Sequence, residues 1–125
     1  FENIMQASNI DIREWEAATV PRAKFQTLTE QMFYILLCLE EEQCGVDIME
    51  RVAAMTEGRV AIGPGTLYSL LENFQKEGFI RETKVEGRRK SYQITVRGQL
   101  LLREEARRLE EQLNHYRKYG KEGRP

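Results

Sequence analysis

The chain has 125 residues, 41% of them hydrophobic and 31% charged, and its 19 Lys and Arg residues nearly balance 20 Asp and Glu residues, giving a net charge of -1. These figures are typical of one globular domain. The longest apolar run, from Met32 to Leu39, is much shorter than the roughly 20 residues that cross a bilayer, so we expect no membrane association. Two cysteines and one histidine exclude a disulfide framework and a usual zinc site, and we expect no metal and no cofactor.

Residues 1–26 have no regular pattern, because isolated apolar residues such as Trp15 alternate with charges and Pro21 interrupts them. We expect an N-terminal arm that is partly disordered and in which a short helix can form. Its first residues lack the basic and apolar segments of a secretory signal, which favours a cytoplasmic location.

Two helices are predicted next. Thr27 and Glu30 have the spacing of a capping box, and the apolar residues that follow up to Leu39 predict a helix at the centre of the core. Apolar residues at helical spacing predict a second helix that ends before Gly58. The residues from 59 to 62 are too few and too β-branched for a helix, and we predict a brief strand there.

A turn over residues 63–66 then leads into a third helix, which Gly78 ends. Beyond Gly78 apolar and polar residues alternate on both sides of Glu86-Gly87-Arg88, which predicts a β-hairpin. A helical pattern returns at Thr95 and continues to Tyr119. The predicted fold is mainly α with a small β-hairpin: a winged helix-turn-helix over residues 27–96, one C-terminal helix over 97–119 and a tail over 120–125.

The third helix would be the recognition helix, whose N-terminal residues enter the major groove of DNA. Glycine lets the backbone approach phosphate, and hydroxyl side chains can contact phosphates or base edges. The predicted DNA-binding residues of this helix are Gly65, Thr66, Tyr68 and Ser69. The alternative is purely structural: Thr66 caps the helix, Pro64 starts it and Tyr68 is half-buried in the core.

The hairpin tip carries three adjacent cations, Arg88, Arg89 and Lys90. Such a run is usually a solvated surface, but directly after a helix-turn-helix it is placed to grip DNA phosphates. The near-zero net charge does not oppose this prediction, because the charges are segregated. Residues 29–58 contain seven acids and one base, whereas residues 76–97 contain seven bases and three acids. The local field decides whether DNA can dock.

The last helix carries an apolar seam with alternating spacings of four and three residues, which is typical of helices that pair. The seam, a predicted dimer interface, consists of Leu102, Ala106, Leu109, Leu113 and Tyr116. Alternatively, the helix folds back on its own domain. Leu100 and Leu101 are available for that contact while the seam serves a second subunit.

The sequence contains no motif of nucleophilic, phosphate-binding or zinc-dependent catalysis, and the single histidine, His115, lies in an arginine-rich helix. We predict no catalytic residues and no enzymatic activity.

Four segments, in order and with family spacing, resemble the PadR family of winged-helix transcriptional regulators, in particular its short subgroup with one C-terminal helix. These segments are Gly65-Thr66-Leu67-Tyr68 with Leu70-Leu71, Lys76-Glu77-Gly78-Phe79-Ile80, Gly87-Arg88-Arg89-Lys90 with Tyr92, and Ile94-Thr95 with Gly98 and Leu102. The chain departs from the family pattern at Val46, which is often aromatic, at Ser91-Tyr92, often two tyrosines, and at Glu72-Asn73, often basic.

The resemblance implies a homodimer that pairs through its last helices, binds an inverted repeat in double-stranded DNA and acts as a repressor released by a small molecule. An aromatic or lipophilic effector is expected. Aromatic residues available to bind it are Trp15, Phe33 and Tyr116, with Phe25 and Tyr119 as further candidates. A second hypothesis stays open: a dimeric ligand-sensing or protein-interaction module without sequence-specific DNA binding, which the Glu72-Asn73 departure makes conceivable.

Overall fold

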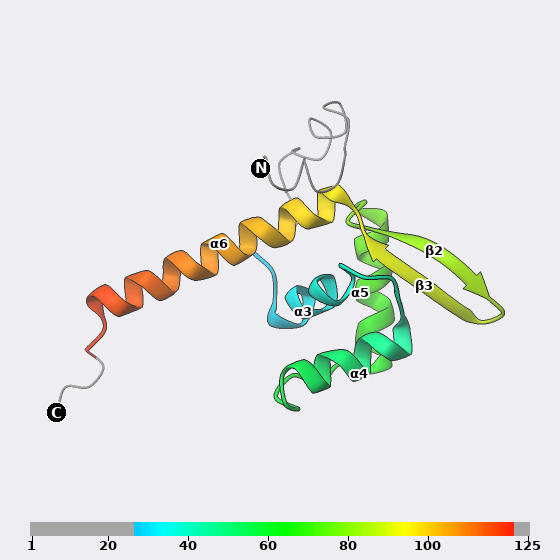
Figure 1. Ribbon diagram of the computed structural model, residues 1–125, viewed down its shortest axis with the longest axis horizontal. Coiled ribbons are helices and arrows are strands. Elements are labelled where there is room, and N and C mark those ends of the chain that lie inside the picture. The colour runs from blue at the N-terminus through cyan, green and yellow to red at the C-terminus, as the bar shows by residue number, and fades with distance from the viewer. Residues whose placement is uncertain (1–26, 122–125) are drawn as a thin grey trace.

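The computed structural model describes residues 27–121, which form four helices and a small antiparallel sheet (Figure 1). In chain order these are α3 (Glu30–Cys38), β1 (Gln43–Cys44), α4 (Gly45–Met55), α5 (Pro64–Lys76), β2 (Ile80–Glu86), β3 (Arg89–Ile94) and α6 (Val96–Tyr119). The predicted fold, mainly α with a β-hairpin and a C-terminal helix, is confirmed. The expectations for the N-terminal arm concern residues outside the described range.

The core lies where α3, α4 and α5 meet, and α3 is central to it as predicted. Ile35, Leu36 and Leu39 have no exposed surface, and neither do Ile48 of α4 and Leu67 of α5. Apolar residues at three- and four-residue spacing place one face of each helix inward, and burying each large aliphatic side chain contributes about 1.5–3 kcal/mol.

The cap of α3 differs from the prediction. The N-cap is Thr29 rather than Thr27, and its Oγ1 accepts a 3.2 Å hydrogen bond from the backbone N–H of Met32. A Thr sits at both positions, but the helix begins only at Glu30. Leu28 is buried in the core, which places Thr29 as the last extended residue before the helix.

The strand predicted over residues 59–62 is wrong. Val60 and Ile62 are buried in the core, but the backbone N–H of Val60 donates to Oγ1 of Thr56 at 3.1 Å instead of to a strand. The short strand is β1, where Gln43 lies opposite Tyr92 of β3. Burial alone therefore explains the β-branched residues of this loop.

The sheet has the order β1-β3-β2, with both pairs antiparallel. Glu86 lies opposite Arg89, so the hairpin turns through only Gly87 and Arg88. Gly87 has a φ of 63°, a left-handed conformation that glycine adopts without steric cost. A register shift between Glu82 and Lys84 interrupts the ladder halfway along β2.

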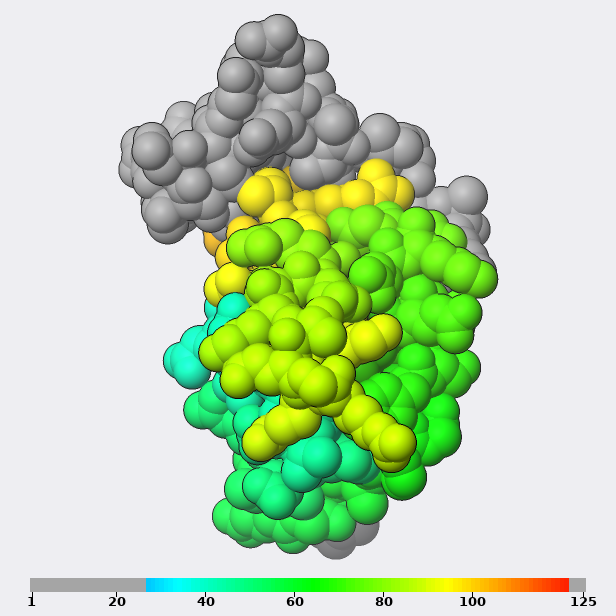
Figure 2. All heavy atoms as spheres, turned by 90° about the vertical axis from the view of Figure 1, so that its right-hand side faces the viewer, coloured from blue at the N-terminus to red at the C-terminus, as the bar shows by residue number. Residues whose placement is uncertain are grey.

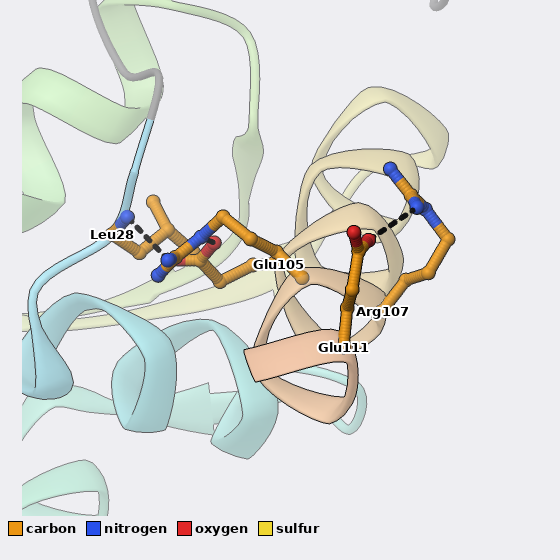
Figure 3. A network of polar contacts seen from close by, with 5 residues as sticks. Leu28, Glu105, Arg107 and Glu111 are labelled. Carbon is orange, nitrogen blue, oxygen red and sulfur yellow. Dashed lines mark hydrogen bonds and ion pairs between the residues drawn. The ribbon is translucent and has the colours of Figure 1, made fainter. Parts of the chain in front are cut away.

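Helix α6 has two parts. Its first turns pack on the winged domain, with Leu101 and Leu102 in the core, and the helix then extends away from the other elements (Figure 1). Glu105 lies where the packed part of α6 ends. Its side chain is 1% exposed, and its carboxylate accepts a hydrogen bond from the backbone N–H of Leu28 (Figure 3). None of the helices among residues 27–121 combines the length and apolar character needed to cross a membrane.

Candidate nucleic-acid interface

The N-terminal end of α5 is open to solvent. The helix begins with Pro64 after the N-cap residue Gly63, and no side chain caps it. Thr66 is therefore inside the first turn and is not the cap, which removes the structural alternative for this residue. The four residues predicted to contact DNA, Gly65, Thr66, Tyr68 and Ser69, are all exposed. The opposite face of α5 is buried through Leu67, Leu71 and Phe74.

Tyr68 is 49% exposed and lies over the first residue of α4. A Cβ atom on Gly45 would be 2.7 Å from the Tyr68 hydroxyl oxygen, a distance that no real Cβ contact maintains. Only glycine at this position lets the ring keep the position that it has in the structure. Gly45 therefore helps to set the direction of the Tyr68 side chain, a role that no pattern in the sequence indicated.

The wing is the hairpin formed by β2 and β3. The sequence had placed its three cations together at the tip, but the structure separates them. Only Arg88 lies in the turn, whereas Arg89 and Lys90 begin β3. Arg89 reaches back to the start of α4, where its Nη2 donates to Cys44 Sγ at 3.1 Å. This bond, together with the negative charge of Asp47 nearby, raises the pKa of Arg89, so its positive charge is secure.

Together these elements form a groove of about 540 Å³ between α5, the start of α4 and the wing. Seen toward the wing tip, the yellow-green hairpin lies in front, with green α5 beside it (Figure 2). The lining residues are Cys44, Gly45, Val46, Tyr68, Glu72, Gln75, Arg88, Arg89, Lys90 and Tyr92. The groove therefore joins a predicted recognition-helix residue, Tyr68, to all three predicted wing cations.

Several groove residues were not predicted from the sequence. Gln75 and Glu72 continue the exposed face of α5 beyond Tyr68, a helical spacing that was available in the sequence. Tyr92 and Cys44 line the groove because β1 pairs with β3, a pairing that no sequence pattern indicated. Cys44 is 8% exposed, so it is more buried than a surface thiol.

The apolar seam of α6 begins later than predicted. Leu102 is 7% exposed and belongs to the core of its own domain. The first part of the helix therefore packs on its own domain, which was the alternative to pairing with a second subunit. Beyond it Ala106 is exposed, and Leu109, Leu113 and Tyr116 are 42%, 45% and 51% exposed. The apolar surface that remains open to a partner therefore runs from Ala106 to Tyr116.

The candidate effector residues are not gathered into one site. Phe33 packs edge-on against Tyr34 beside the core, with ring centroids 5.5 Å apart. Tyr116 lies near the far end of α6, which Figure 1 shows well away from α3. Trp15 and Phe25 lie outside the described residues. Among residues 27–121, no group of three or more His, Cys, Asp or Glu side chains is arranged to hold a metal ion.

Comparison with known proteins identifies the family. Residues 35–104, more than half of the chain, match the family described as "Transcriptional regulator PadR-like family". The chain belongs to the PadR-like family. It is therefore a DNA-binding transcriptional regulator and not an enzyme. A search of curated protein sequences found no significant match.

Solved structures of PadR regulators have the same fold. A PadR family transcriptional regulator from Eggerthella lenta is 18% identical with a TM-score of 0.64, covering 98% of this chain and 96% of its own. A transcriptional regulator from Clostridium thermocellum is 24% identical with a TM-score of 0.63, covering 74% and 93%. A PadR-like transcription factor from Bacteroides fragilis is 28% identical with a TM-score of 0.53, covering 68% and 86%.

Proposed function

We propose that the chain is a homodimeric repressor that binds an inverted-repeat operator and is released from it by a small molecule. The observation that carries the proposal is the groove in which Tyr68 of α5 faces Arg88, Arg89 and Lys90 of the wing. A helix end rich in hydroxyl groups suits the major groove, and three cations suit the phosphates beside it. Both lie on one side of the domain, as a single DNA duplex requires.

Phosphate contact is attributed to the wing. Arg88, Arg89 and Lys90 are all exposed, and none of them forms an ion pair with an acid among the residues that the structure describes. Their charges are therefore available to a polyanion. Each phosphate that they neutralise releases counterions, which makes binding depend on salt concentration.

Dimerisation is attributed to the exposed part of α6. Leu109, Leu113 and Tyr116 form an apolar stripe on a helix that extends beyond its own domain, and a second copy of the same stripe would cover it. A twofold dimer presents two recognition helices, which read successive major grooves about 34 Å apart when the half-sites form an inverted repeat.

Release by a small aromatic or lipophilic molecule is the regulatory part of the proposal. Phe33, Tyr116 and Tyr119 are the aromatic candidates that the structure describes, and Trp15 is the single tryptophan of the chain. An effector acts only if it binds the DNA-incompetent dimer more tightly than the DNA-bound one. A tryptophan fluorescence titration with phenolic, cationic and lipophilic compounds tests for a site near Trp15, and DNA release by the same compound tests its role.

The experiment that tests the whole proposal is a gel shift with the DNA upstream of the chain's own gene. We expect retardation of this fragment but not of a scrambled one, with two protein copies per operator and loss of binding when either half-site is scrambled. A reporter gene behind this operator should be less active when the protein is present. Equal retardation of native and scrambled DNA would contradict sequence-specific binding and would favour the protein-interaction hypothesis.

A further inference from the structure

Glu72 is the single acid among the ten residues that line the groove, whose other charged members are the three wing cations. Its side chain is 71% exposed. A carboxylate facing DNA is repelled by the phosphates, and this repulsion weakens binding unless the carboxylate meets a hydrogen-bond donor on the DNA. Its position in the groove therefore needs a chemical explanation.

The helix places Glu72 on the exposed face that carries Tyr68. It lies four residues after Tyr68 and thus directly beyond it along α5, because residues four apart share a helix face. The buried face of the same helix consists of Leu67, Leu71 and Phe74. Within the groove, Glu72 lies on the recognition helix, whereas the cations that hold phosphate lie on the wing.

An ionised carboxylate can only accept hydrogen bonds. In the major groove the base edges offer two donors, the N4 amino group of cytosine and the N6 amino group of adenine. Adenine presents the acceptor N7 beside its amino group, and a carboxylate that approaches N6 is repelled by N7. Cytosine itself presents N4 without an acceptor, so it is the better match.

The neighbouring cation does not remove Glu72 from this role. Lys76 Nζ lies 3.7 Å from Glu72 Oε1, but both side chains are 71% exposed. Exposed pairs of this kind contribute little and exchange readily with water. Lys76 lowers the local negative charge while leaving the second carboxylate oxygen available to a base.

We propose that Glu72 is a specificity-determining residue that accepts a hydrogen bond from the N4 amino group of a cytosine in each operator half-site. The proposal rests on the proposed function, in which α5 enters the major groove. It assigns to this chain a base preference that a basic residue at this position would not give.

The test begins with selection of operators from a randomised DNA library by wild-type protein, followed by binding measurements with each base at every position. Wild type should prefer cytosine at one position of each half-site by about tenfold, the scale of one good base contact. E72A should lose this preference and keep the others. E72Q should shift it toward adenine, because an amide can bond N6 and N7 together.

A change on the DNA side makes the test independent of protein folding. N4-methylcytosine still pairs with guanine through one N4 hydrogen, but a methyl group replaces the other N4 hydrogen, which faces the major groove. This base should weaken wild-type binding about tenfold and leave E72A unaffected. The matched control is E50Q, which removes the same charge from an exposed position outside the groove and should leave every base preference unchanged.

Two results would overturn the assignment. If E72A strengthens binding to all sequences equally, Glu72 acts only by repelling phosphate; if N4-methylcytosine weakens wild type and E72A alike, another residue reads that base. The failure of the proposed function looks different, because wild-type protein would then select no common sequence at all.

Discussion

The backbone N–H of Leu28 donates a 2.6 Å hydrogen bond to Oε2 of Glu105, although the two residues are 77 positions apart in the chain. Arg108 donates to both oxygens of the same carboxylate, at 2.6 and 3.0 Å. The network joins α6 to the segment that precedes α3 at the point where α6 leaves the domain. It therefore holds the direction of the candidate dimer helix relative to the winged domain.

Replacing Glu105 with Ala should lower the free energy of unfolding by about 2 kcal/mol, because a buried N–H then loses its acceptor. Arg108 is 32% exposed and can return to water, which limits the loss. E105Q keeps an acceptor oxygen and should cost about 1 kcal/mol. Urea unfolding followed by circular dichroism, at one fixed protein concentration, measures both values.

The control for this prediction is E111Q on the same helix. Glu111 pairs with Arg107 at 3.4 Å, but both side chains are more than half exposed, so its replacement should change stability by less than about 0.5 kcal/mol. Equal effects of E105A and E111Q would show that the buried carboxylate does not hold α6 in place.

Gly98 is a second point where α6 is fixed. A Cβ atom at this position would lie 2.1 Å from the backbone oxygen of Phe79, which cannot move without displacing the start of β2. G98A should therefore destabilise the fold by about 3 kcal/mol, at the upper end of the cost of overpacking. Thermal unfolding of G98A and of G63A, whose Cβ would enter open space, provides the comparison. A melting temperature of G98A equal to that of G63A would contradict the packing.

The contact between Gly45 and Tyr68 should affect DNA binding more than stability. A methyl group at Gly45 meets the far end of the Tyr68 ring, which can swing away at little cost to the fold. We expect G45A to weaken operator binding about tenfold while unfolding changes by less than about 1 kcal/mol. Fluorescence anisotropy with labelled operator measures the affinity.

A double-mutant cycle isolates this effect. In a Y68A background, G45A should leave the affinity unchanged, because the ring that the methyl group displaces is absent. An equal loss from G45A in both backgrounds would mean that Gly45 acts by itself, through the approach of the α4 backbone to DNA.

The sequence predicted the elements of this fold that are marked by local chemistry. The turn predicted over residues 63–66 is shorter in the structure, because Pro64 already begins α5. Gly87 sets the predicted turn of the hairpin, and Thr95, where the helical pattern was predicted to return, caps α6 by accepting a 3.1 Å hydrogen bond from the N–H of Gly98. These signals act within a few residues, so they are visible without a tertiary structure.

The parts that were not predicted depend on contacts between distant segments. The strand β1 has only two residues, and Gln43 is in a strand because Tyr92 lies opposite it. The burial of Leu102 has the same origin: a heptad pattern shows an apolar face but not whether the partner is a second subunit or the domain itself. In the sequence Glu72 stands out only as a departure from a family pattern, and only the structure shows that it lines the groove.

The wing cations should determine the salt dependence of DNA binding. R88A and K90A should each reduce the slope of log affinity against log salt by about 1.8, because each substitution removes one phosphate contact, worth about 0.9, from each of the two copies on the operator. R59A is the control, because Arg59 lies outside the groove and pairs with Glu30. Measurement of operator affinity at several salt concentrations decides the outcome. Slopes of R88A and K90A that match wild type would exclude Arg88 and Lys90 from phosphate contact.

The exposed part of α6 should control self-association. Leu113 is 45% exposed in the single chain, and covering this exposed part contributes about 1 kcal/mol in each copy, because burying a fully exposed leucine contributes about 1.5–3 kcal/mol. L113E removes this contribution from both copies and introduces two charges, so the dimer dissociation constant should rise at least about a hundredfold. Sedimentation velocity over a range of concentrations measures it.

The matched control for L113E is N114E, which adds the same charge to the adjacent exposed position outside the seam. N114E should remain as associated as wild type, and both variants should keep the helical content of wild type, because the winged domain buries neither residue. Operator affinity should fall in L113E even though no groove residue has changed, since a monomer engages only one half-site. If L113E instead stays dimeric, the seam from Ala106 to Tyr116 is not the interface and another surface must join the two copies.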